Sequence, residues 1–315
     1  MASYNWNHGW GRLIANKMAQ QAGTGKVIIA CNSDNALYMD LLAMFPETDK
    51  SAVRTTLQLA IDEATLEADG SAIFVAPNYT ETIIAAGGLD TGTDTAGLKI
   101  IGLGEGDERP LISYSTSAAA DFNIGSNGVT VENMRFDFTG VDALTGPIDV
   151  NDSGVTFRNC EFTTADSSGQ CVTGIVTDAN ASDLTIEDCY FYGSENAGTT
   201  SAIRIVGGNR AKIKNNHIEG AFKTTAGGIE VTTTAAGFLE IKGNVIKNKT
   251  ASSTRAINLV EGTRATIVDN DMHVLSGTSP VSVAESLTTL TVGGYVTVSR
   301  NYFTTTTGIV AGTLL

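Results

Sequence analysis

The sequence predicts an all-β fold: a right-handed, single-stranded parallel β-helix of about eight coils, with a small N-terminal α/β cap and an N-terminal arm. Three observations lead to this prediction. The chain repeats itself at a period of 26 to 31 residues, each repeat alternates apolar and polar residues, and residues 97–303 show no helical spacing. Self-similarity at this period is typical of stacked repeats, and alternation is typical of strands.

The first element is an arm of residues 1–25, which carries both tryptophans of the chain. Tyr4, Trp6, Trp10 and Leu13 are large side chains near a terminus, where chains are usually polar and frayed. Two interpretations stay open for them. They fold back on the cap, or they anchor the protein to a partner protein, because Trp and Tyr dominate binding hot spots.

Residues 26–70 are interpreted as the cap. Residues 26–30 form an apolar run that predicts a strand, and residues 72–77 form another. Between them, residues 49–64 have the spacing of an amphipathic helix. Its expected apolar face consists of Val53, Leu57, Ala60, Ile61 and Ala64. A helix at this place would cover the open end of the β-helix, which is otherwise an exposed sheet edge and core.

The β-helix itself is expected over residues 71–315. Seven stretches carry the repeat: GVTVENMRF (128–136), GVTFRNCEF (154–162), DLTIEDCYF (183–191), RAKIKNNHI (210–218), FLEIKGNVI (238–246), RATIVDNDM (264–272) and YVTVSRNYF (295–303). Their apolar fourth positions are Val131, Phe157, Ile186, Ile213, Ile241, Ile267 and Val298, and Ile100 continues the series upstream. Each stretch predicts two short strands separated by a tight turn.

A further strand precedes the stretch in most repeats, so each coil is expected to contain three strands. The segments that predict it are 146–150, 202–205, 228–231, 256–259 and 280–283. Coils that rise by one strand spacing of roughly 4.8 Å would build a rod of about 40 Å. Equivalent positions of successive coils then lie above one another, so each column of the repeat predicts a ladder of side chains.

The columns predict structural ladders and no reaction centre. Asn216, Asn244, Asn270 and Asn301 share the inward seventh position, where amides can bond to one another and to the turn backbone. Cys160 and Cys189 precede them in the same column and are expected to be reduced. The eighth position is outward and mixed; it reads Arg135, Glu161, Tyr190, His217, Val245, Asp271 and Tyr302.

Composition excludes several functional classes. The chain has 315 residues, is 42% hydrophobic and has a net charge of −14, which argues against nucleic-acid binding. No apolar run approaches the 18 or so residues of a membrane span. We also expect no signal peptide, and therefore synthesis in the cytoplasm.

No group of residues assembles an active site in the sequence, so we expect no catalytic residues, no metal and no cofactor. The nearest approach to an acidic pocket is Asp137, Asp149 and Asp152, with Glu161 as a possible fourth member. The three histidines are too scattered for a zinc site.

Several segments resemble a group of tailed-bacteriophage virion proteins with pectate-lyase-like β-helices. These segments are residues 25–29, the end of the expected helix at 59–64, FVAPNYTETI (74–83), KIIGLGEGDERPLISY (99–114) and VTVENMRF (129–136). The resemblance covers roughly the first half of the chain. The acidic clusters and paired bases of enzymes with this fold have no counterpart in the columns.

The resemblance implies a non-enzymatic structural role on the virion surface. It favours a capsid decoration protein or head appendage, attached to the capsid or other virion proteins through the N-terminal arm. It also implies a homo-oligomer, with a trimer favoured, and allows contact with a host-surface glycan. The alternatives are a polysaccharide depolymerase or lyase, and a glycan-binding tailspike without catalysis.

Overall fold

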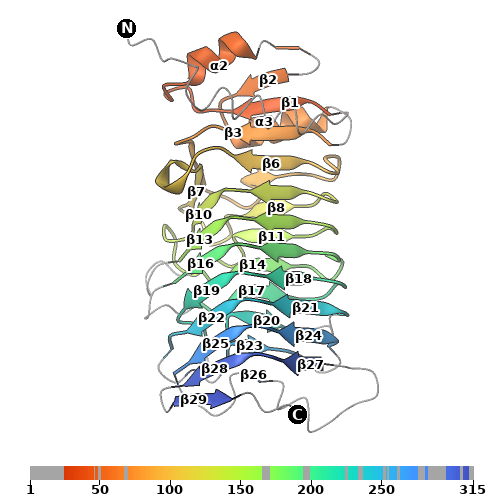
Figure 1. Cartoon of the computed structure of the whole chain (residues 1–315). Coiled ribbons are helices and arrows are strands. Elements are labelled where there is room, and N and C mark those ends of the chain that lie inside the picture. The colour runs from red at the N-terminus through yellow and green to blue at the C-terminus, as the bar shows by residue number, and fades with distance from the viewer. Residues whose placement is uncertain are drawn as a thin grey trace.

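The computed structural model describes most of the chain, and Figure 1 shows it as one stack of coils. The described residues are 25–45, 47–48, 51–66, 70–164, 171–193, 199–223, 226–232, 237–250, 253, 255–260, 263–275, 281–282, 296–305 and 308–311. Tyr4, Trp6, Trp10 and Leu13 lie outside them, so the prediction for the arm stays a prediction.

Three parallel sheets run along the stack in this part of the chain, which confirms the predicted fold class. Sheet A contains β2 (Ser51–Arg54), β1 (Val27–Ala30), β3 (Ala72–Val75), β6 (Lys99–Gly102), β9 (Thr130–Glu132), β12 (Thr156–Arg158), β15 (Thr185–Glu187), β18 (Lys212–Lys214), β21 (Leu239–Lys242), β24 (Ala265–Val268) and β27 (Val296–Ser299).

Sheet B contains β4 (Thr80–Ile83), β7 (Leu111–Tyr114), β10 (Arg135–Asp137), β13 (Glu161–Thr163), β16 (Tyr190–Tyr192), β19 (His217–Gly220), β22 (Val245–Asn248), β25 (Asp271–Val274), β28 (Tyr302–Thr305) and β29 (Gly308–Ala311). Sheet C contains β5 (Leu89–Asp90), β8 (Phe122–Ile124), β11 (Ile148–Val150), β14 (Thr173–Thr177), β17 (Ser201–Ile205), β20 (Ile229–Val231), β23 (Ile257–Asn258) and β26 (Val281–Ser282). Only the pairing of β28 with β29 is antiparallel among these strands.

The strand register stacks equivalent positions of successive coils, as the repeat predicted. Val131 pairs with Phe157, and Phe157 pairs in turn with Ile186. Inside the coils the aromatic column is continuous: the ring centroids of Phe136 and Phe162 are 5.3 Å apart, and those of Phe162 and Phe191 are 4.4 Å apart. One buried core therefore extends from Ile28 to Val274.

The tight turn between the strands of sheets A and B uses left-handed backbone at the sixth position of each repeat. The residues there have φ between 51° and 68°: Asn133, Asn159, Asp188, Asn215, Gly243, Asp269 and Arg300. Asn, Asp and Gly tolerate this conformation best, which explains their prevalence at this position. Each turn aims the next residue, at the seventh position, into the core.

The helix predicted over residues 49–64 is wrong in its first half. Residues 51–54 instead form β2, which pairs with β1 and extends sheet A beyond the first coil. Helix α3 (Leu57–Thr65) begins after Thr56, whose side chain accepts a hydrogen bond from the Leu59 amide. Pairing with the edge of β1 gives the backbone N–H and C=O groups of residues 51–54 hydrogen-bond partners, and the β-branched Val53 favours a strand. This segment therefore forms a strand and not the first turns of the helix.

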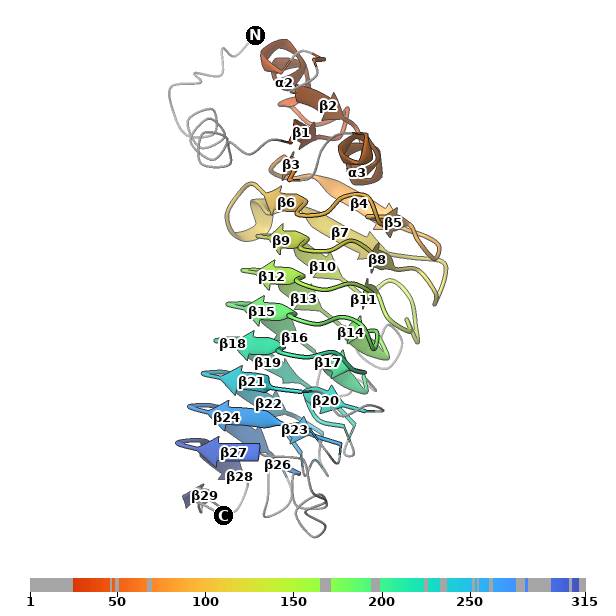
Figure 2. The ribbon, with the colours of Figure 1, turned by 90° about the vertical axis from the view of Figure 1, so that its right-hand side faces the viewer.

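Two helices cover the N-terminal end of the stack (Figure 2). Helix α3 buries Leu57, Ala60, Ile61 and Ala64 in the core of the coils. Helix α2 (Tyr38–Met44), which the sequence did not predict, packs Leu41 against the opposite face of sheet A, beside Ile29 and Phe74. The first strands of sheet A are thus buried on both faces, which explains their continuous apolar sequences.

The short helix η1 (Gly106–Glu108) lies between β6 and β7. No helix that the structure describes has the length and apolar character needed to cross a membrane.

Candidate binding face

The four asparagines of the seventh position lie in one buried column and bond to one another. The Nδ2 of Asn216 donates to Oδ1 of Asn244 at 3.0 Å, and Asn244 and Asn270 donate onward at 2.9 Å. Each Oδ1 also accepts the backbone N–H of the preceding coil's turn; the Asn216 amide, for example, lies 2.9 Å from Oδ1 of Asn244. The ladder therefore serves the backbone of the turns and leaves no open ligand group.

Outward charges on the described coils pair mainly with charges of neighbouring coils. Arg158 bonds Glu187 at 2.6 Å, Arg210 forms a two-bond pair with Asp183, and Arg300 forms one with Asp269. In each pair the partners occupy the same position in successive coils. The pKa values of Asp183 and Asp269 are lowered, first by hydrogen bonds from their arginines.

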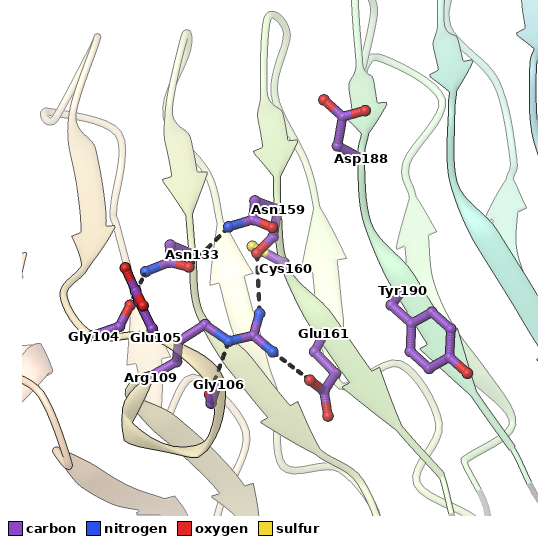
Figure 3. Close-up of a pocket in the computed structure, with 10 residues that line it drawn as sticks. All are labelled: Gly104, Glu105, Gly106, Arg109, Asn133, Asn159, Cys160, Glu161, Asp188 and Tyr190. Atoms are coloured by element: carbon purple, nitrogen blue, oxygen red, sulfur yellow. Dashed lines mark hydrogen bonds and ion pairs between the residues drawn. The ribbon is translucent and has the colours of Figure 1, made fainter.

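An open groove of about 440 Å³ lies where the chain passes from sheet A to sheet B, and Figure 3 shows its lining. Arg109, just after η1, crosses it. The Arg109 Nε donates to the Gly106 carbonyl at 3.1 Å and its Nη1 to the Asn159 carbonyl at 3.3 Å, while its Nη2 forms an ion pair with Glu161. Tyr190 borders the groove on the next coil.

The groove opens onto the outward face of sheet B, where two rows of side chains cross the strands. The eighth-position row places Glu161, Tyr190 and His217 side by side. The tenth-position row, two residues further along each strand, places Tyr192 beside Glu219, and Glu219 beside Lys247.

Tyr190 and Tyr192 are exposed, and neighbouring side chains contact both rings. Tyr190 is 39% accessible and Tyr192 is 44% accessible, and their ring centroids lie 6.3 Å apart with the ring planes 10° from parallel. The imidazole of His217 lies 4.8 Å from the Tyr190 ring, and the Lys249 ammonium lies 5.4 Å from the centre of the Tyr192 ring. A lysine over an aromatic face is an attractive cation–π arrangement.

Glu219 joins the basic groups of this face. Its carboxylate lies 2.7 Å from Lys249, 2.9 Å from His217 and 3.3 Å from Lys247. Hydrogen bonds from Lys249, His217 and Lys247 lower the pKa of Glu219 to about 2. The Glu219 carboxylate thus contacts three basic side chains of this face.

The acidic residues considered in the sequence do not meet. Asp137 lies in sheet B and accepts the Thr139 amide, whereas Asp149 lies in sheet C and Asp152 accepts the Ser153 amide in the following turn. Spacing along the chain could not show this, because Asp137 and Asp149 belong to different sheets of the coil. Glu161, the possible fourth member, pairs with Arg109 instead.

Asp149 has other acidic neighbours, which lie at the ends of sheet C strands: Asp121 just before β8 and Asp178 just after β14. Burial raises the pKa of Asp149, and the charges of Asp121 and Asp178 raise it further. Burial likewise raises the pKa of Asp121, with a contribution from Asp90. Among the described residues, no three Asp, Glu, His or Cys side chains form a group that could hold a metal ion. Cys31, Cys160, Cys171 and Cys189 are all buried free thiols.

Sequence reasoning singled out neither the outward face of sheet B around Tyr190 and Tyr192 nor the groove beside it. Tyr190 and His217 appeared in the eighth-position column, but their exposure and contact were not visible in it. Tyr192, Glu219 and Lys247 share the tenth position, a column just beyond the nine-residue repeat. Extending the repeat by one residue would have revealed the adjacent row.

Comparisons with known proteins agree with this architecture. The family model described as "Right handed beta helix region" matches residues 112–272, just over half of the chain. No curated protein and no solved structure gave a significant match.

Proposed function

The chain belongs to the family of right-handed β-helix region proteins, and we propose that it is a non-enzymatic structural protein of a tailed-phage virion. In this proposal it decorates the capsid or forms a head appendage on the virion surface, and its N-terminal arm attaches it. The phage assignment rests on the resemblance of the segments between residues 25 and 136.

The observation that carries a structural role is the pairing of outward charges along the stack. Arg158 with Glu187, Arg210 with Asp183, and Arg300 with Asp269 each join one coil to the next. Individual surface pairs contribute little stability, but each is directed at a neighbouring coil and not at a common reaction centre. Such an arrangement suits a rod that must stay straight and soluble.

Apolar side chains at the N-terminal end support attachment there. Helix α2 exposes Met39, Leu42 and Met44, with side chains 72%, 38% and 47% accessible. Methionine-rich surfaces adapt well to a protein partner. We propose that this surface and the arm, with Tyr4, Trp6, Trp10 and Leu13, contact the virion together. Side-by-side association into a homotrimer belongs to the same proposal.

The test is attachment to particles. Purified full-length protein is added to capsids that lack it, and binding is measured by co-sedimentation and located by cryo-electron microscopy. Full-length protein should bind, whereas deletion of residues 1–25 and the variant Met39→Ser/Met44→Ser should each reduce binding. Sedimentation equilibrium of the free protein measures the oligomeric state. Equal binding by all forms would overturn attachment through this end.

A polysaccharide depolymerase is the second candidate, and the sheet C acids are the observation that favours it. A carboxyl group with a raised pKa, such as Asp121 or Asp149, is suited to act as a general acid. Incubation with capsular polysaccharides, with and without calcium, measures this activity through newly formed chain ends. Cleavage that is lost in Asp149→Ala would replace the non-enzymatic proposal.

A further inference from the structure

The outward face of sheet A carries a second candidate surface at the C-terminal coils, around Phe238, Arg264, Lys212 and Lys242. We infer that this face binds an acidic segment of a partner protein, with an apolar side chain of that segment against the Phe238 ring. The proposed function places attachment at the other end of the stack, so the two proposals are independent of each other (Figure 2).

Phe238 occupies a position whose backbone does not favour it. It stands just before β21, at the first position of the repeat, and its φ of 58° lies in the left-handed region. The same position carries glycine, Gly128 and Gly154, in two earlier coils. A bulky side chain is rare in this conformation, and such outliers gather at functional sites. Burial does not explain the residue, because Phe238 is 64% exposed.

The Phe238 ring is contacted by a neighbouring side chain and borders a groove. The Arg264 guanidinium lies over the ring, 5.5 Å from its centre, which is a cation–π arrangement. A groove of about 400 Å³ beside this pair is also lined by Leu239, Glu240 and Thr266. Aromatic and arginine side chains are enriched in binding hot spots, and a side chain that is already oriented loses little entropy on binding. The groove therefore offers an apolar side chain of a partner a place beside the ring.

Lysines outnumber carboxylates on β18 and β21 of this face. Lys212 lies beside Glu240 in the strand register, and Lys214 lies beside Lys242. Glu240, the single carboxylate of these two strands, forms an ion pair with Lys214 at 2.9 Å. Lys212 and Lys242 are exposed and add two positive charges to the face. An anionic partner would be attracted here and would lessen the repulsion between Lys214 and Lys242.

The carboxylates of the adjoining coils already have arginine partners. Asp183 accepts from Arg210 at 2.7 Å, and Asp269 accepts from Arg300 at 2.7 Å. The charge balance also changes along the sequence. Residues 26–193 contain 26 Asp and Glu against seven Lys and Arg, whereas residues 194–315 contain eight against eleven. The acidic character of the chain is therefore concentrated in the N-terminal coils, and an acidic partner is repelled least at the C-terminal ones.

Other anionic ligands fit this face less well. Tight binding of nucleic acid requires many phosphate contacts, and a free phosphate would leave the Phe238 ring uncovered. A protein segment supplies carboxylates and an apolar side chain within a short length. From β18 to β24 the face crosses two strand spacings, roughly 10 Å, which an extended segment of about three residues spans.

The experiment is an NMR titration of the isotope-labelled full-length protein with acetylated pentapeptides, at low and high salt. The probe peptide has phenylalanine between two pairs of glutamates. One control peptide has glutamine in place of every glutamate, a second has alanine in place of phenylalanine, and pentathymidylate tests nucleic acid. The site variants are Phe238→Asn and Lys212→Gln/Lys242→Gln. The matched control variants are Tyr302→Ala, an exposed aromatic residue of sheet B, and Lys223→Gln, an exposed lysine after β19.

We expect the probe peptide to shift amide signals of β18, β21 and β24. Both control peptides, and the probe peptide on each site variant, should bind about fivefold more weakly or less. Added salt should weaken binding of the probe peptide. The control variants should bind the probe peptide as the wild type does.

Phe238→Asn separates binding from folding. Asparagine adopts the left-handed conformation more readily than phenylalanine, so the thermal midpoint of this variant should equal or exceed that of the wild type. A lower midpoint would make Phe238 a structural residue and would overturn the inference. Absence of binding by the probe peptide, equal loss in the control variants, or tighter binding of pentathymidylate would overturn it too. None of these results bears on attachment through the N-terminal end.

Discussion

At the scale of single residues, position in the repeat decides what an asparagine does. Asn133 and Asn159 occupy the sixth position, where left-handed backbone is required, and their side chains lie at the groove. Asn216 and Asn244 occupy the seventh position and are buried. Asparagine therefore has two roles in adjacent columns. At the sixth position it adopts the left-handed backbone conformation of the turn, and at the seventh its side chain forms the buried hydrogen bonds.

Asn244→Ala should be strongly destabilising. The side chain accepts from Asn216 and donates to Asn270 and to the Ile213 carbonyl, so its loss leaves several buried groups unpaired. We expect a loss of about 3 kcal/mol, measured as a lowered midpoint of thermal unfolding. Asn180→Ala, at an exposed position, is the control and should change stability by less than about 0.5 kcal/mol. Equal effects of the two variants would contradict the ladder's role.

Glu219 should make stability depend on pH in the acidic range. Its pKa in the folded protein is lowered to about 2, whereas an unfolded glutamate titrates near 4.3 or so. A depressed pKa stabilises the fold above the unfolded value, and this contribution disappears as pH falls toward about 2. Solvent screening limits its size to about 1 to 2 kcal/mol.

The measurement compares the thermal midpoints of wild type and Glu219→Gln as a function of pH. The difference should be present at pH 7 and should shrink as the pH is lowered from about 4.5 to about 2. A difference that does not vary with pH would show that the carboxylate charge is not the cause.

At the scale of elements, the sequence located the strands of the coils but divided the cap incorrectly. The apolar positions of α3 were recognised, yet its helical pattern was extended backward over residues that pair as β2. Helix α2 was missed because only Leu41 among its residues is fully buried, so its pattern is not clearly amphipathic. Both differences arise where tertiary contacts outweigh local propensity.

Ile61→Ala in α3 should destabilise the whole stack. Ile61 is completely buried in the core that α3 shares with the first coil. The cavity left by this substitution should cost about 2 to 5 kcal/mol, measured by thermal unfolding. Leu59→Ala on the same helix is the matched control, because Leu59 is 47% exposed. A small effect of Ile61→Ala would mean that α3 does not support the coil core.

At the scale of the whole molecule, the coils form a nearly one-dimensional stack, in which each coil contacts its neighbours. Only equivalent positions stack, so the strand register is kept from coil to coil, while the loops absorb a coil length that varies between 26 and 31 residues. The pairings of Lys212 with Glu240 and of Ile213 with Ile241 define one full coil of 28 residues.

Removal of one whole coil should therefore be tolerated. Deletion of residues 213–240 joins Lys212 to Ile241, which takes the place of Ile213 in its column. Deletion of residues 213–239 instead puts Glu240 in that inward place and reverses the faces of the strand. We expect the first variant to remain soluble and β-rich with a cooperative melt, and the second to aggregate. Circular dichroism and gel filtration compare them, and similar behaviour would contradict a strict column register.

By itself, the sequence determined that this chain is a β-helix, where its coils repeat, and which side chains face inward, because alternating strands that recur every 26 to 31 residues bury their apolar side chains by stacking coil on coil. Only the tertiary structure decided which neighbours meet on the surface. Arg109 reaches Glu161 from 52 residues away, and Tyr192, Glu219 and Lys247 form one row across three strands. Residue spacing shows which position of the coil each residue occupies. The outward positions differ in residue type from coil to coil, so their contacts depend on where the turns and strands place each side chain.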